Sequence, residues 1–100
     1  MDAIPDRSQV LLSFQRTLAG GMHAQLRQAS VELHPSSQIV RVRFEYDGTP
    51  DAAVKETCSS AATDVISEFP APWDLNVEHR VVPYPHRLSA LENVVYVRRE

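Results

Sequence analysis

The sequence predicts an α+β fold, a two-layer sandwich with the element order αββαββ, in which a four-stranded, mostly antiparallel sheet carries two helices on one face. Hydrophobic and polar side chains alternate from Gln38 to Tyr46, which is typical of a half-buried strand. From Val54 to Phe69 the hydrophobic period changes to about 3.6 residues, which predicts a helix lying on that sheet. The apolar stripe of this helix consists of Val54, Cys58, Ala61, Ala62, Val65 and Phe69.

The length and charge of the chain limit the kinds of protein that it can be. One hundred residues predict a single domain spanning 1–100. A formal charge of -3 argues against non-specific binding to nucleic acid or to a membrane surface, which would favour a basic protein. The N-terminal residues lack the basic and then apolar pattern of a signal peptide, so we expect a cytoplasmic protein. The single Cys58 excludes an intramolecular disulfide and is expected to be a buried small hydrophobic residue.

The first third of the chain predicts a helix and then a strand. Asp6 or Ser8 can cap a helix that ends near Ala19, before the glycine pair 20–21, and Leu12 falls on its outward side. Its buried stripe is Val10, Leu11, Phe14 and Leu18. Residues 22–24 are expected to form a connecting segment. A strand is expected at residues 26–33, joined by the loop 34–38 to the next strand as an antiparallel hairpin.

Turn residues separate the remaining elements. Residues 47–50 predict a turn, after which Asp51 can cap the second helix. Prolines at 70 and 72 end that helix, and a third strand is expected from Leu75 to Val82, with His79 on its core face as a structural residue rather than a ligand. Residues 83–91 predict an ordered loop because they are rich in proline.

The last strand is expected over residues 93–99, as the second strand of a second hairpin. Val95 and Val97 alternate there with Val94, Tyr96 and Arg98. The order of the strands in the sheet stays open.

Helices on one face would leave the other face of the sheet open to solvent. That face should carry Gln28, Ser30, Glu32, Arg41, Arg43, Glu45, Asn76, Glu78, Arg80, Tyr96 and Arg98. Both signs of charge are present, and cross-strand ion pairs in water explain such an array without a ligand. Only Tyr96 is aromatic, whereas a sheet that binds RNA bases would place several aromatic rings on its middle strands. We therefore expect no nucleic-acid partner.

Catalytic and metal-binding motifs are absent from the sequence. There is no glycine-rich phosphate loop, nucleophile elbow, Cys-x-x-Cys or His-Glu-x-x-His. The four histidines fall in different predicted elements, so no metal site and no cofactor are expected. The carboxylate pairs Asp47 with Asp51 and Glu68 with Asp74 bracket turns, where capping explains them. The sequence therefore predicts a protein without enzymatic activity.

Several fragments of the chain do resemble a known group of proteins. They are the run 43–48 (RFEYDG), the helix end 68–70 (EFP), the segment 82–85 (VPYP) and the closing run 94–100 (VVYVRRE). In this order they resemble small immunity proteins of bacterial contact-dependent inhibition and related polymorphic toxin systems. The resemblance implies a protein that binds and neutralises the C-terminal domain of a cognate toxin in the cytoplasm. We expect the chain to be a monomer or weak homodimer. It assigns no role to any single residue.

The acidic charge adds the expectation of a basic toxin, commonly a nuclease, because carboxylates can occupy a groove that binds phosphates. A small ligand-binding or regulatory α+β module without catalytic activity is the alternative. A small enzyme is a third possibility.

The candidate toxin-binding surface is the outward side of the second helix. Short polar side chains lie at its centre, where solubility alone would favour longer charged ones, and carboxylates gather near its C-terminal end. The candidate residues are Glu56, Ser60, Thr63, Asp64, Ser67, Glu68 and Asp74. An ordinary solvated helix and a site on the open sheet face are the alternatives.

Overall fold

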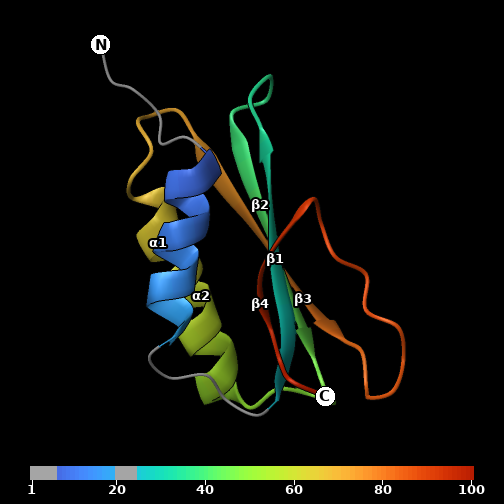
Figure 1. The fold of residues 1–100 in the computed structure, drawn as a ribbon. Coiled ribbons are helices and arrows are strands. Elements are labelled where there is room, and N and C mark those ends of the chain that lie inside the picture. Colours follow the sequence, from blue (N-terminus) through green and yellow to red (C-terminus); the bar gives the residue numbers. More distant parts are fainter. Residues whose placement is uncertain (1–6, 20–24) are drawn as a thin grey trace.

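The computed structural model describes residues 7–19 and 25–100 and confirms the predicted order of elements. The elements are α1 (Arg7–Ala19), β1 (Leu26–His34), β2 (Ile39–Tyr46), α2 (Ala52–Ile66), β3 (Asp74–Val81) and β4 (Asn93–Val97). Both helices lie on the same face of the four-stranded sheet, as predicted (Figure 1). The expectations for Leu18, for the glycine pair and for residues 22–24 concern side chains or segments outside the described residues. Neither helix in the described part of the chain is long and apolar enough to cross a membrane.

The strands run in the order β3-β2-β1-β4. β1 and β2 form the predicted antiparallel hairpin, and β4 also pairs antiparallel with β1. β3 pairs parallel with β2, because α2 returns the chain to the end of the sheet where β2 began. The predicted hairpin of the third and fourth strands is therefore wrong, since β3 and β4 form opposite edges of a mixed sheet.

The core lies between the sheet and the helices. Alternate residues of β2, from Val40 to Tyr46, are fully buried there, as their period predicts. The predicted stripe of α2 is also buried, and α1 contributes Val10 and Phe14. Leu12 is 55% exposed, in agreement with its predicted outward position.

Asp51 occupies the predicted N-cap position of α2, but its side chain makes no capping hydrogen bond. That capping prediction is wrong. Gly48 adopts a φ of 86°, which confirms the predicted turn before the helix.

A bulge in β4 changes which side chains meet the core. Tyr96 lies opposite Ala29, but Val94 lies opposite Ser30, so that Val95 is the extra residue. Tyr96 therefore packs against the core together with Val95, and Val97 is exposed. The simple alternation predicted from the sequence placed Tyr96 and Val97 on the wrong faces.

A second bulge, in β1, places Arg27 at the centre of a polar cluster. Leu26 pairs with Tyr46 and Gln28 with Glu45, which leaves Arg27 as the extra residue. The Arg27 guanidinium is buried and binds the Glu100 carboxylate with two nitrogens. Its Nη1 also donates to the carbonyl oxygens of Val82 and His86, at 2.7 and 2.8 Å. One side chain thus joins β1, the segment after β3 and the C-terminal end of the chain.

The sheet face away from the helices is covered at its centre, contrary to the prediction. The ordered loop between β3 and β4 lies over it (Figure 1). The Ser89 amide donates to the buried Glu45 carboxylate at 2.7 Å, and the Leu91 amide donates to the Ser30 hydroxyl at 2.9 Å. Arg43 holds the loop through the Ser89 carbonyl and also pairs with Glu78. Three residues of the predicted open face are therefore buried, namely Gln28, Ser30 and Glu45.

Removal of the Arg27 charge should destabilise the fold strongly. We expect Arg27→Met to lower the free energy of unfolding by about 3 kcal/mol, because it leaves Glu100 and two carbonyls without their donor. Urea unfolding measures this change. Arg41→Met is the matched control, since Arg41 forms a more exposed pair with Glu32 at 3.4 Å, and it should cost less than about 1 kcal/mol. Equal losses in the two variants would contradict the structural role of Arg27.

Candidate functional site

The candidate residues of α2 lie together on its exposed side. Glu56, Ser60, Thr63 and Ser67 follow each other at helical spacing, opposite the buried stripe. The Thr63 hydroxyl donates to the Ser59 carbonyl at 3.0 Å, and the Ser67 hydroxyl donates to the Asp64 carbonyl at 2.6 Å. These hydroxyls stay close to the helix backbone, so the centre of this surface is low and open to a partner.

The carboxylates at the end of α2 are unfavourably placed for the helix itself. Asp64 and Glu68 are four residues apart and lie at the C-terminal end, where the helix dipole favours cations. The last turn of α2 contains no basic residue. Among residues 7–19 and 25–100, no hydrogen bond or ion pair satisfies the Asp64 carboxylate. Local helix stability therefore does not explain these two acidic residues.

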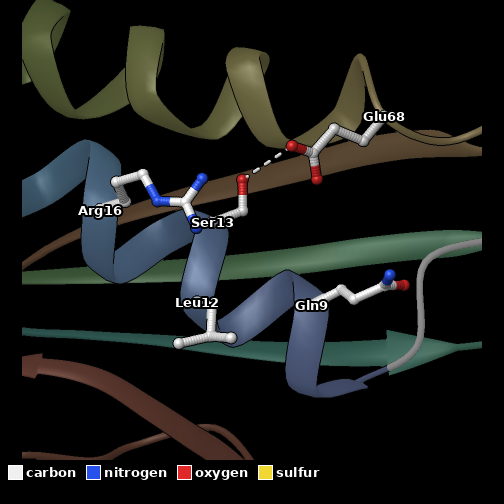
Figure 2. A pocket seen from close by; sticks show the side chains of 5 residues that line it. All are labelled: Gln9, Leu12, Ser13, Arg16 and Glu68. Carbon is white, nitrogen blue, oxygen red and sulfur yellow. Dashed lines mark hydrogen bonds between the residues drawn. The ribbon is translucent and has the colours of Figure 1, made fainter.

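A hollow of about 360 Å³ lies between α1 and the end of α2. It is lined by Gln9, Leu12, Ser13, Arg16 and Glu68. Figure 2 shows the Ser13 hydroxyl donating to Glu68, at 2.9 Å, with Arg16 on the same side of α1 and Leu12 further along it. The hollow adds an exposed apolar side chain and a guanidinium to the acidic end of α2. Sequence reasoning missed this contribution from α1, although the outward position of Leu12 was a usable indication.

Asp74 does not belong to this surface. It is the first residue of β3 and pairs in register with Ile39, one position before the buried Val40. Its side chain therefore projects to the sheet face opposite the helices. The Asp74 carboxylate accepts a hydrogen bond from the Leu75 amide at 2.8 Å. The structure brings six of the seven candidate residues onto or beside one helix face and separates the seventh.

A second hollow, of about 210 Å³, lies between the N-terminal part of α2 and the end of β3. It is lined by Tyr46, Thr49, Pro50, Lys55, His79 and Val81. His79 is held on both sides, with Nδ1 2.7 Å from the Tyr46 hydroxyl and Nε2 3.1 Å from the Ser59 hydroxyl. Its ring also stacks on Phe44, with centroids 5.5 Å apart. These contacts confirm the prediction that His79 is a structural residue on the helix face of β3.

The surroundings of this hollow disfavour ionisation. Burial, with a smaller effect of the Lys55 ammonium, lowers the pKa of His79 below 6.5. Burial also raises the pKa values of the Tyr46 hydroxyl and the Cys58 thiol. The three groups are therefore neutral near pH 7 and serve packing and hydrogen bonding. In the described part of the chain, no group of three His, Cys, Asp or Glu residues could hold a metal ion.

Protonation of His79 should lower stability in a defined pH window. Because the pKa of His79 is lower in the folded than in the unfolded chain, the free energy of unfolding should fall as the pH drops below about 6.5, and should be unaffected above it. The lowered pKa values of Asp47, Glu78 and Glu100 act at more acidic pH, below about 4.5.

Urea unfolding at about pH 7.5 and about pH 5 measures this dependence. His79→Gln should reduce it, whereas the matched variant His86→Gln, at an exposed loop position, should keep it. An unchanged pH dependence in His79→Gln would refute this assignment.

The chain matches one known family. A sequence model described as MafI2 immunity protein matches residues 7–100. No curated protein matches the chain.

Proposed function

Since the chain belongs to the MafI2 immunity protein family, we propose that it binds the C-terminal domain of a cognate bacterial toxin in the cytoplasm and blocks the toxin's active site or substrate groove. The surface we assign to this contact is the outer face of α2, made of Glu56, Ser60, Thr63, Asp64, Ser67 and Glu68, together with the adjoining hollow. An immunity protein acts by binding, so the chain needs no catalytic residue, metal or cofactor for this role.

The observation that carries the assignment is the pair Asp64 and Glu68. Both carboxylates are exposed at the C-terminal end of α2, where the helix dipole disfavours negative charge. A basic partner surface would neutralise these two carboxylates, so their unfavourable position in the free protein would favour binding. The low Ser and Thr side chains beside them let such a partner approach the helix closely.

This arrangement suits a toxin that is a nuclease. A nuclease binds phosphates in an electropositive groove, and the carboxylates of Asp64, in the last turn of α2, and Glu68, just after its C-cap, can occupy phosphate positions. Leu12 and Arg16, beside Glu68, add an apolar contact and a donor for a carboxylate of the toxin.

The alternative function is the binding of a small ligand at the hollow beside His79. Its lining combines Val81, Pro50 and Tyr46 with the Lys55 ammonium, which would favour a small apolar molecule bearing a negative charge. Native mass spectrometry of the purified chain distinguishes this function, because a retained ligand would add its mass.

Charge reversal at the end of α2 should abolish protection. Co-expression with the toxin encoded by the neighbouring gene measures survival, and calorimetry measures affinity. Close charge pairs across an interface each contribute about 1.5–7 kcal/mol, so Asp64→Lys with Glu68→Lys should weaken binding at least about 100-fold. The melting temperature should change little, because both positions are exposed.

The control is Asp51→Lys with Glu92→Lys, which changes the net charge equally at exposed positions elsewhere. It should retain protection. Loss of protection in the control but not in the α2 variant would place the contact on another surface.

A further inference from the structure

In the described part of the chain, no strand pairs with the outer side of β3. The Asp74 amide donates to the Gln38 carbonyl at 2.9 Å, and the Val82 amide donates to the Tyr46 carbonyl at 2.8 Å. Backbone groups alternate in direction along a strand, so the even-numbered residues of β3 pair with β2. The odd-numbered residues, from 75 to 81, therefore direct their N–H and C=O groups to the outer edge. The Leu75 amide there donates to the Asp74 carboxylate at 2.8 Å, so pairing would exchange this hydrogen bond for one to a carbonyl of the second strand.

This edge is regular enough to accept another strand. Its pairing with β2 is continuous from Asp74 to Val81, without a bulge, and the strand contains no proline. The opposite edge, β4, has only five residues and is interrupted by the bulge at Val95. Short length and bulges protect an edge from pairing, and β3 has neither.

We propose that β3 pairs with β3 of a second copy of this chain, antiparallel and centred on Val77, so that two four-stranded sheets become one. The pairing is independent of toxin binding. The main evidence for this pairing is the self-complementary pattern of charges along the strand.

The charges on the sheet face away from the helices select the register. With the two-fold axis at Val77, Asp74 lies opposite Arg80 of the second copy, and Asn76 lies opposite Glu78, and symmetry repeats both pairs. Arg80 already pairs with Glu78 of its own strand at 2.9 Å, so Asp74 would complete a charge network.

Other registers are less favourable. An axis at Glu78 places the two Glu78 carboxylates against each other, and an axis at Asn76 places Asp74 against Glu78. An axis at His79 places Leu75 against Pro83, which has no N–H group to donate. The register centred on Val77 avoids all three conflicts.

The helix face of the edge fits the same register. The pairs there are Leu75 with His79, Val77 with Val77, and Trp73 with Val81. Val81 is 51% exposed in the single chain, and Leu75, Val77 and Trp73 are only partly buried, so the pairing covers apolar surface. Ser59 contacts His79 from the flank of α2 nearest this edge. This small side chain leaves room for α2 of the second copy.

Sedimentation equilibrium tests the proposal with paired charge variants. The wild-type chain should show, with rising concentration, a species of twice its 11.2 kDa mass. Asp74→Arg alone sets two arginines against each other across the interface, and Arg80→Asp alone sets two aspartates against each other, so each should weaken self-association about tenfold or more.

 

The Asp74→Arg chain carries arginine at both 74 and 80, and the Arg80→Asp chain carries aspartate at both. Each arginine of the first chain therefore faces an aspartate of the second in the mixed dimer. Mixing the two variants restores both opposite-charge pairs and should restore the dimer.

Circular dichroism establishes that each variant is folded, and Gln15→Lys, at an exposed position of α1, which packs on α2 and β4, is the control that should dimerise normally. A wild-type chain that remains a monomer at about 1 mM overturns the proposal. So does a mixture that associates no better than its components. A monomeric wild type whose Asp74→Arg variant loses toxin binding would assign the edge to a strand of the toxin instead.

Discussion

Burial of the Arg27 guanidinium is possible only because the fold surrounds it with acceptors. A buried charge is costly unless it is paired and hydrogen-bonded, and Arg27 meets this condition with Glu100 and the carbonyls of Val82 and His86. The Tyr84 ring lies beside it, with the guanidinium carbon 5.5 Å from the ring centroid. These partners are in the loop after β3 and at the C-terminal end, so the position of one side chain constrains both segments. The Glu100 carboxylate in turn has its pKa lowered, first by the hydrogen bond from Arg27.

This constraint determines which surfaces are available for partners. The loop held by Arg27 covers the centre of one sheet face, where Glu45 and Ser30 bind it from below. The helices cover the other face. The outer side of the helix layer and the edge at β3 remain among the available surfaces, and these two have different character. The first carries unbalanced negative charge and suits a basic partner, whereas the second carries alternating charge and suits a copy of itself.

The period of the sequence was sufficient to predict the elements and most of the core. The burial of Phe44 and Val65 could be predicted because hydrophobic residues recur every two positions in a strand with one buried face and about every 3.6 positions in such a helix. Both elements are regular, so the pattern holds along their whole length. The bulges at Arg27 and Val95 escaped prediction because an inserted residue inverts the faces locally without changing composition.

Contacts between elements were harder to predict. Exposure of the α2 candidates follows from the helical wheel, but the contribution of Leu12 depends on how two helices pack, and the position of Asp74 depends on the direction of β3. The covering of Glu45 required knowing that a distant loop returns over it, which periodicity does not encode.

The sequence separation between paired strands indicates the order in which parts of the sheet can form. The β1–β2 hairpin closes a turn of a few residues, whereas Arg27 and Glu100 are 73 residues apart. Loop closure over a long segment costs more entropy, and contacts between distant residues slow folding. The hairpin and α2 can therefore assemble first, and the pairing of β4 with β1 comes late. In the native protein the Arg27 contacts oppose this entropy, so β4 and the loop before it should stay closed until those contacts break.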